Sequence, residues 1–228
     1  MYVERTEKRN LSKSAVKRSC FAISPKSRKI DTNTIKSTAI CGVSQLIGAQ
    51  MLFPRQKTPD LELATLDHGE FKLSNEQSQR GTLICFYRGY HCPLCIKYLT
   101  ELDRLVPEFE KRGINVIAVS SDAKDRAELM RDKVDAKNLR FGYGLPLTEA
   151  RDWGLFISTS NGKTSVGVEE PDLFAEPGLF LISPDRSLYF SSVQTMPFVR
   201  PSFREMLGAL DFVIEKNYPA RGEYRGEV

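Results

Sequence analysis

Two cysteines separated by two residues, Cys92 and Cys95, stand where a strand pattern gives way to a helix pattern. Residues 82–87 are almost all apolar or aromatic, which predicts a strand buried on both faces. Residues 96–111 repeat apolar side chains at helical spacing, so we expect a helix there. Pro93 suits the first helical position, where its missing N–H costs nothing. The chain must therefore fold so that a central strand leads directly into a helix that carries both thiols.

This position predicts chemical reactivity for the thiols. The first turn of a helix carries unpaired N–H groups and the positive end of the helix dipole, and both stabilise a thiolate. The pKa of a cysteine thiol there falls, and its reactivity at neutral pH rises. Positive charge from Arg88, His91 and Lys97 would lower that pKa further. A second thiol one turn away can then close a disulfide within the same molecule.

The same cysteine spacing also occurs in zinc sites, which need four ligands. Two such pairs, or one pair with two histidines, usually supply them. The other cysteines and the histidines are scattered along the chain: Cys20, Cys41, Cys85, His68 and His91. A metal site built on His91, Cys92 and Cys95 with a distant fourth ligand remains an alternative, and an inert structural pair is another. We favour a redox pair that needs neither metal nor cofactor.

The composition of the chain changes near Met51. Residues 1–50 contain ten Lys or Arg and three Asp or Glu, whereas the rest carries a net charge of −3. Because apolar residues in this first part are scattered, we predict a mostly disordered basic extension, followed by one domain over residues 51–228. Two explanations of the extension stay open. It is either a targeting peptide, against which Glu4 and Glu7 count, or a dispensable segment before a natural start at Met51.

The composition also excludes several classes of protein. No run of 18 apolar residues exists, so we expect no membrane span. The mildly acidic region after residue 50 lacks the basic face that nucleic-acid binding requires. Five cysteines are too few for a disulfide scaffold, and the odd count favours a reducing compartment, the cytoplasm. Cys85 lies inside the buried strand, where we expect it to pack as a small core residue.

The rest of the chain alternates strand and helix patterns. We expect a hairpin over 61–73, a buried strand over 114–119, a helix over 125–132, an extended piece over 139–146, a short helix over 148–155, an irregular stretch over 158–177, a strand over 179–183 with an antiparallel partner over 188–190, and a helix over 201–217.

This order of elements resembles the thioredoxin superfamily. Within it, the motifs at residues 86–95 (FYRGYHCPLC) and 176–185 (EPGLFLISPD) are most similar to the alkyl hydroperoxide reductase/thiol-specific antioxidant group, the peroxiredoxin-like redoxins. The resemblance covers about residues 54–217. It implies an α/β, thioredoxin-like fold, with a central mixed sheet flanked by helices and an N-terminal β-hairpin. It also implies a cis-proline facing the cysteines, and Pro177 matches that proline.

Two alignments compete at the cysteines. Compared with a thioredoxin, Cys92 is the attacking thiolate and Cys95 resolves. Compared with a peroxiredoxin, Cys95 falls on the peroxidatic position, while Arg88 and Cys92 replace the expected proline and threonine. The arginine that the family has before its late strand is absent. Arg88 or Arg200 is the candidate replacement.

The leading hypothesis is a thiol–disulfide oxidoreductase in which Cys92 attacks and Cys95 resolves. It would act on protein or small-molecule disulfides, with hydroperoxides as further substrates, and would draw electrons from a thioredoxin or glutathione system. Catalysis would be supported by Arg88, His91, Pro177 and Arg200. The first alternative is an antioxidant peroxidase with Cys95 peroxidatic, and the second is a non-enzymatic redox-sensing or binding module.

Overall fold

The structure is a computed structural model that describes residues 51–228. The expected disordered extension, with Cys20 and Cys41, lies outside the described residues, and the division at residue 50 stays a prediction. Among the helices from residue 51 onward, none is both long enough and apolar enough to cross a membrane.

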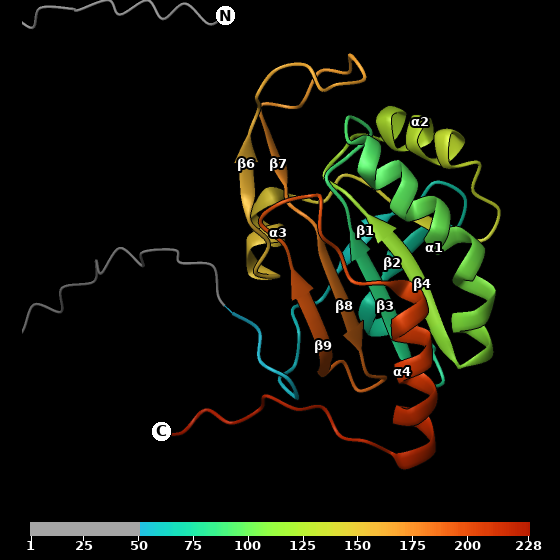
Figure 1. Ribbon diagram of the computed structural model, residues 1–228, viewed down its shortest axis with the longest axis vertical. Coiled ribbons are helices and arrows are strands. Elements are labelled where there is room, and N and C mark those ends of the chain that lie inside the picture. Colours follow the sequence, from blue (N-terminus) through green and yellow to red (C-terminus); the bar gives the residue numbers. More distant parts are fainter. Residues whose placement is uncertain (1–50) are drawn as a thin grey trace, which may run out of the picture. The chain divides into compact units, whose positions relative to one another are not determined.

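A mixed five-stranded sheet forms the centre of the described region (Figure 1). Its strand order is β5-β4-β3-β8-β9, with β3, β4 and β5 parallel and with β8 and β9 antiparallel to their neighbours. The elements are β1 (Glu62–Ala64), β2 (Glu70–Lys72), the short 3-10 helix η1 (Leu73–Asn75), β3 (Gly81–Phe86), α1 (Pro93–Lys111), β4 (Ile114–Val119), α2 (Lys124–Val134), β5 (Arg140–Gly142), α3 (Leu147–Asp152), β6 (Ile157–Thr159), β7 (Leu173–Ala175), β8 (Gly178–Ile182), β9 (Leu188–Val193) and α4 (Phe203–Lys216).

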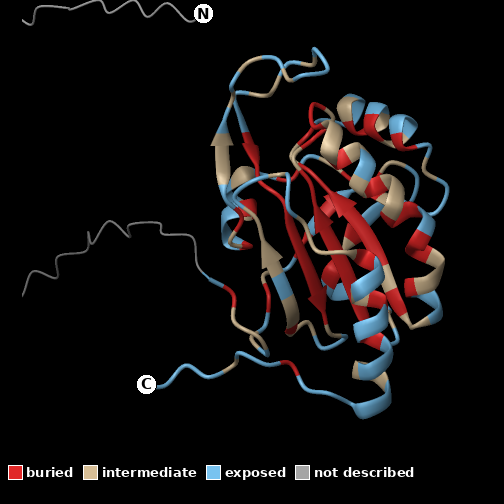
Figure 2. Ribbon diagram, viewed as in Figure 1, coloured by how far each residue is buried: buried red, intermediate tan, exposed pale blue. Residues whose placement is uncertain are grey.

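Side chains of the central strand β3 alternate between two cores, one on each face of the sheet. Leu83 and Cys85 join the core beneath α1, α2 and α4. Ile84 and Phe86 join the core beneath the β1–β2 hairpin and the segment around α3. Every residue of β3 is buried (Figure 2). The strand that delivers the cysteines is therefore fixed from both sides, as expected for a strand in the middle of a covered sheet.

The mixed sheet, its flanking helices and the N-terminal hairpin confirm the architecture expected from the sequence. The expected irregular stretch over residues 158–177 is the main error. Short strands β6 and β7 pair there in an antiparallel hairpin, with Ser158 opposite Phe174. Each strand has three residues, which is too short for a period-2 pattern to stand out in the sequence.

The expected cis-proline is also wrong. The structure contains no cis peptide bond among residues 51–228, so the bond before Pro177 is trans. Pro177 connects β7 to β8, and its carbonyl accepts a hydrogen bond from the N–H of Gln194. An extended chain that continues from one strand into the next is compatible with the trans form, which is the more stable one before proline.

Three aromatic rings pack together beneath the sheet and predict a large cost of truncation. Phe180 lies 5.6 Å from Phe86 and 5.2 Å from Trp153, measured between ring centroids, and all three are buried. Replacing Phe180 with Ala should lower the free energy of unfolding by about 3–5 kcal/mol, because a cavity replaces the ring. Urea denaturation measures this change. Phe212, whose side chain is largely exposed, is the control: F212A should cost far less, and equal costs would contradict this packing.

Candidate active site

Cys92 and Cys95 lie at the start of α1, immediately beyond the carboxyl end of β3. Cys92 is the N-cap residue, Pro93 begins the helix, and Cys95 lies in its first turn. The backbone N–H groups of Cys95 and Ile96 both donate to the carbonyl of Cys92. Only 1% of Cys92 and none of Cys95 is exposed. Both thiols therefore lie at the positive end of a helix in a largely water-excluded environment.

The two thiols have opposite acidities. The pKa of Cys92 is lowered to about 6, chiefly by a hydrogen bond from the Cys95 thiol. The Cys95 backbone N–H and the charges of Arg200 and Arg88 lower it further, against the opposing effect of burial. The pKa of Cys95 is raised well above its ordinary value, first by burial and then by the neighbouring Cys92. At neutral pH, Cys92 is therefore the thiolate and Cys95 the thiol.

Arg200 is the cation closest to both sulfurs. Its Nη2 lies 3.1 Å from the Sγ of Cys95 and 4.0 Å from the Sγ of Cys92. The guanidinium carbon lies 5.0 Å from the ring centre of Tyr98, and Nε donates to the carbonyl of Pro197. These contacts hold a positive charge against the pair of sulfurs, although more than 100 residues separate them in sequence.

Tyr98 fastens the segment that carries Arg200 to α1. Its hydroxyl donates to the carbonyl of Pro201, and its ring stacks on Phe203 at 4.1 Å between centroids. The position of the Arg200 guanidinium therefore depends on a residue one turn beyond Cys95. No pattern in the sequence indicated that Tyr98 positions Arg200, because an aromatic residue on a helix is usually a packing residue.

Arg88, the other expected cation, is engaged by carboxylates. Its Nη2 lies 3.4 Å from Glu170, and its Nε lies 3.4 Å from Glu176. Its guanidinium also covers the ring of Phe174, at 4.6 Å from the centroid. Because Glu170 and Glu176 neutralise it, Arg88 contributes less to the thiolate than an unpaired cation would. It anchors the β6–β7 hairpin beside the loop that delivers the cysteines.

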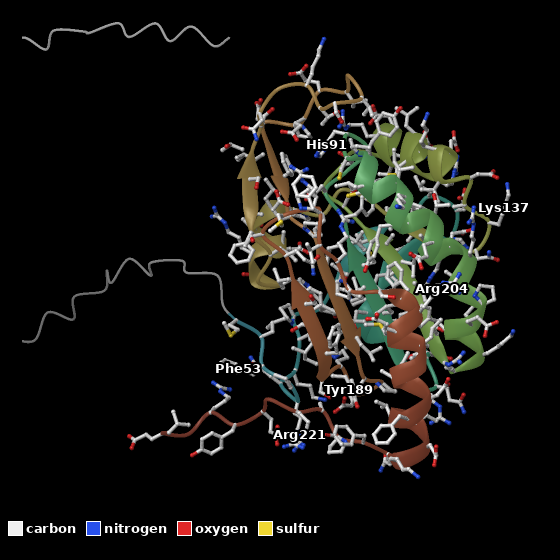
Figure 3. All side chains as sticks on the ribbon, in the orientation of Figure 1. Phe53, His91, Lys137, Tyr189, Arg204 and Arg221 are labelled. Atoms are coloured by element: carbon white, nitrogen blue, oxygen red, sulfur yellow. The ribbon has the colours of Figure 1, made fainter. Side chains whose placement is uncertain are left out.

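His91 does not supply the expected positive charge. Its side chain is fully buried, and its ring lies 4.7 Å from that of Phe174 (Figure 3). Burial, followed by repulsion from Arg88, lowers its pKa to about 4. His91 is consequently neutral at pH 7, and the suggestion that it stabilises the thiolate as a cation was wrong. Lys97 is exposed on α1, and Cys85 is buried with its pKa raised to about 12 by desolvation.

A residue that sequence reasoning missed, Asp122, shapes the loop before Cys92. Its Oδ2 accepts from the N–H of Tyr90 at 2.7 Å, while its Oδ1 accepts from Nε of Arg126. Gly89 has φ of +138°, and a Cβ there would meet the Asp122 carboxylate at 2.8 Å. Glycine is required because the carboxylate packs directly against the backbone. The available signal was a polar residue just after a buried strand, at the sheet edge where Cys92 also lies.

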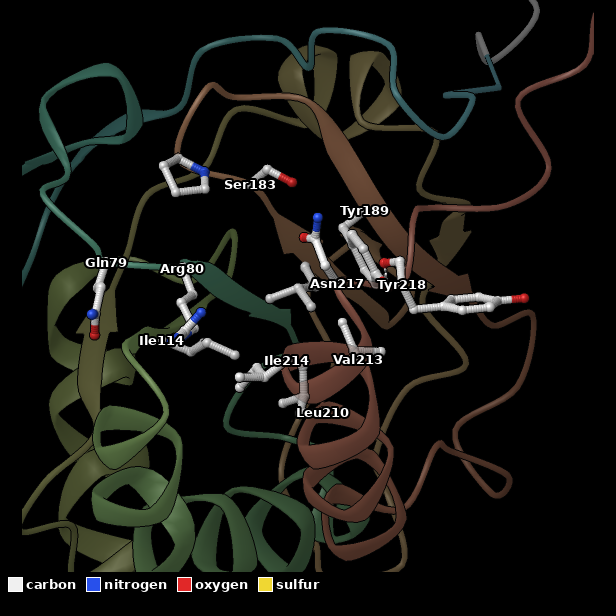
Figure 4. Close-up of a pocket in the computed structure, with 12 residues that line it drawn as sticks. Gln79, Arg80, Ile114, Ser183, Tyr189, Leu210, Val213, Ile214, Asn217 and Tyr218 are labelled. Atoms are coloured by element: carbon white, nitrogen blue, oxygen red, sulfur yellow. Dashed lines mark hydrogen bonds between the residues drawn. The ribbon is translucent and has the colours of Figure 1, made fainter.

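Two surface hollows lie at opposite ends of the sheet. One, of about 300 Å³, adjoins Leu94, Tyr98, Phe198 and Arg200 and so borders the site. The other, of about 270 Å³, lies near Arg80 and α4, where β3 and β4 begin (Figure 4). No cysteine lines either hollow. The first adjoins Arg200, which contacts both cysteine sulfurs, so it is the one of the two that lies nearer the thiols.

The zinc alternative has no geometric support. From residue 51 to the end of the chain, no group of three or more His, Cys, Asp or Glu side chains is arranged to hold a metal ion. His91 packs its ring on Phe174.

Comparisons with known proteins agree with this geometry. The chain matches the AhpC/TSA family over residues 54–191. It is 30% identical over 145 residues to the selenocysteine-containing peroxiredoxin PrxU of Peptoclostridium acidaminophilum, covering 62% of this chain and 68% of that protein. A 1-Cys peroxiredoxin of Dictyostelium discoideum is 30% identical over 97 residues, or 42% of this chain and 38% of that protein.

Solved peroxiredoxin structures share the fold. Peroxiredoxin 6 of Arenicola marina superposes with a TM-score of 0.58 at 19% identity, covering 73% of this chain and 76% of that one. AhpC of Mycobacterium tuberculosis gives 0.57 at 16% identity, covering 72% and 99%. These matches confirm the thioredoxin-like, peroxiredoxin-type architecture that the sequence motifs implied.

The acidity of Cys92 predicts a specific response to loss of its neighbour. Ultraviolet absorbance of the thiolate, followed against pH, should show one sulfur ionising near pH 6. Replacing Cys95 with Ala removes the main hydrogen bond to that sulfur, so the pKa of Cys92 should rise toward the ordinary cysteine value of about 8.5. In C92A the remaining Cys95 thiol should stay protonated at neutral pH. A Cys92 pKa that does not change in C95A would contradict this account.

The two arginines should fail in different ways. Arg88→Gln leaves two buried carboxylates unpaired and should lower the free energy of unfolding by about 3–5 kcal/mol, measured by urea denaturation. Arg200→Gln breaks no ion pair with a carboxylate, so it should destabilise the fold less. It should instead raise the pKa of Cys92 by about one pH unit or more, because the nearest cation is lost. The reverse pattern would show that the roles are exchanged.

Proposed function

The chain belongs to the AhpC/TSA family, and we propose that it is a peroxidase in which Cys92 reduces a hydroperoxide and Cys95 resolves the oxidised sulfur. That it is a thiol-dependent oxidoreductase follows from its family and its peroxiredoxin relatives. The observation that carries the finer proposal is the contrast in acidity between the two thiols. It supports Cys92 as the attacking sulfur, as in the sequence-based hypothesis.

In the first step the Cys92 thiolate attacks the distal oxygen of the hydroperoxide. The O–O bond breaks, Cys92 becomes a sulfenic acid, and the leaving alkoxide takes up a proton to give the alcohol. Charge moves from sulfur to oxygen during this transfer. The Arg200 guanidinium, 4.0 Å from the Cys92 sulfur, can donate to the peroxide oxygens, and it offers positive charge that is not shared with a carboxylate.

In the second step the Cys95 sulfur attacks the sulfur of the sulfenic acid, and water leaves as the disulfide forms. The two cysteines lie within one helical turn, so the resolving thiol is always close. A dithiol of the thioredoxin type, or two glutathione thiols, then reduces the disulfide, becomes oxidised to a disulfide itself and regenerates the pair. This cycle needs a reducing compartment such as the cytoplasm, to which we assign the protein.

Two other schemes use the same residues. Disulfide reduction also starts from an acidic Cys92, and the closely spaced pair supports it as the second candidate. The peroxiredoxin alignment makes Cys95 the attacking sulfur, but its raised pKa argues against that assignment. The non-enzymatic alternative is set aside because the family relationship identifies an enzyme. Pro177 remains a proposed contributor to substrate contact, in its trans form.

Single-turnover kinetics test the order of attack. Reduced wild type should consume one equivalent of hydrogen peroxide and lose both thiols. C92S should consume peroxide no faster than buffer, because the remaining thiol is protonated. C95S should still react once and hold a sulfenic acid on Cys92, detected by dimedone labelling and mass spectrometry. Without a resolving thiol beside Cys92, it should form no disulfide within the pair.

The competing schemes give different results. Peroxide consumption that survives C92S but not C95S would select Cys95 as the attacking sulfur. Rapid reduction of a model disulfide without any reaction with peroxide would select the disulfide reductase. C85S is the matched control, because Cys85 is a buried cysteine in the same core. Its loss should leave the peroxide reaction intact.

A further inference from the structure

A groove follows the exposed side of α1, starting beside Arg200. It consists of two hollows of about 300 and 340 Å³ that share Lys97 and Glu101 in their linings. The first hollow is bordered by Arg200, which contacts the sulfur of Cys95 at 3.1 Å. The second is bordered by Arg104 and Arg204. We refer to the two hollows together as the α1 groove.

The α1 groove is apolar at the end near the thiols. Leu94, Tyr98 and Phe198 line the first hollow together with Pro197 and Pro201. Phe198 is 75% exposed. An apolar ligand chain lying here would cover this ring and bury its own methylene groups.

The far part of the α1 groove is cationic. Lys97, Arg104 and Arg204 line the second hollow, and its one carboxylate, Glu101, lies 3.6 Å from Arg204. In the part of the chain that the structure describes, no carboxylate pairs with Lys97 or Arg104 within 4 Å. Both side chains are exposed. Arg204 is the second residue of α4, next to α1 (Figure 3). The groove therefore offers two unpaired positive charges to an anion.

We propose that the α1 groove selects hydroperoxides that carry a carboxylate at the end of an apolar chain, with Lys97 and Arg104 as the residues that determine this specificity. The inference rests on the proposed peroxidase function and names its substrate class. The chain would lie against Leu94, Tyr98 and Phe198. The peroxide group would meet Arg200 and Cys92, and the product would be the corresponding hydroxy acid.

The spacing along α1 sets the length of the substrate. At 1.5 Å per residue, Lys97 lies about 8 Å and Arg104 about 18 Å beyond Cys92 along the helix axis. A carboxylate close to the peroxide group reaches neither cation. A chain of medium length brings the carboxylate to Lys97, and a longer chain brings it to Arg104. The preference for the acid should therefore grow with chain length.

Stopped-flow oxidation of the reduced protein tests the proposal without any reductant. The substrates are ω-hydroperoxydodecanoate, its methyl ester and ω-hydroperoxyhexanoate, with hydrogen peroxide as a reference. The wild-type thiols should be oxidised by ω-hydroperoxydodecanoate faster than by its methyl ester, by about two- to fivefold for each cation engaged. This difference in rate should shrink at high salt. The rate advantage over the ester should be smaller for ω-hydroperoxyhexanoate.

The variant K97Q/R104Q should lose the preference for the acid, measured within the variant as the ratio of its rate with the acid to its rate with the ester. Both residues are exposed helix positions, and Gln is a good helix former, so the fold should be retained. K111Q is the matched control. It removes one exposed cation at the other end of the same helix, and its preference for the acid should equal that of wild type.

The possible failures are distinguishable. If no peroxide oxidises the wild type, the proposed function itself is wrong. If acid and ester react equally with the wild type, the function stands and the selectivity does not. A preference that persists in K97Q/R104Q, or that falls equally in K111Q, would overturn the assignment of these residues. If K97Q/R104Q changes only reduction by a thioredoxin-type protein, the cations serve a protein partner and the proposal is wrong.

Discussion

A negative charge on a buried sulfur needs compensation, and the arrangement around Cys92 supplies it from several directions. The Cys95 thiol and backbone N–H lower the pKa of Cys92 to about 6 against the cost of burial, and the Arg200 charge adds to their effect. The helix start accounts for the N–H group and for the position of the second thiol. The surrounding fold holds β3, α1 and the Arg200 segment so that the helix start and the guanidinium both lie beside the cysteine sulfurs.

The charges near the site are divided between two tasks. Arg88 forms ion pairs with Glu170 and Glu176, which neutralise most of its charge. These ion pairs connect the β6–β7 hairpin to the cysteine loop. Arg200 forms no ion pair with a carboxylate in the described region and contacts the sulfurs instead. Two cations of the same type near one thiolate thus differ in effect because their partners differ. Sequence alone names both arginines but does not reveal their partners.

The sequence predicted the features that depend on residues close together in the chain, and it failed for features that depend on tertiary contacts. The strand over 114–119 and the helix start at Cys92 follow from apolar patterns and a proline, and both were predicted correctly. The charge state of His91 follows from burial against Phe174, which is more than 80 residues away. The bond before Pro177 was assigned cis by resemblance, whereas the chain continues extended from β7 into β8. Such features depend on tertiary neighbours that no local pattern contains.

The choice between Cys92 and Cys95 shows where family resemblance and physical reasoning diverge. Alignment on Phe86 and Tyr87 assigns the attacking role to Cys95, although Arg88 and Cys92 replace the proline and the threonine of the peroxiredoxin motif. The acidities give the opposite answer: the pKa of Cys95 is raised by burial and by its neighbour Cys92, while the pKa of Cys92, the helix cap, is lowered by a hydrogen bond from Cys95. A thiol that stays protonated is a poor nucleophile whatever its place in an alignment. The departures from the motif, with a second cysteine where threonine is expected, are consistent with an attacking sulfur that has moved to position 92 and left the original position for resolution.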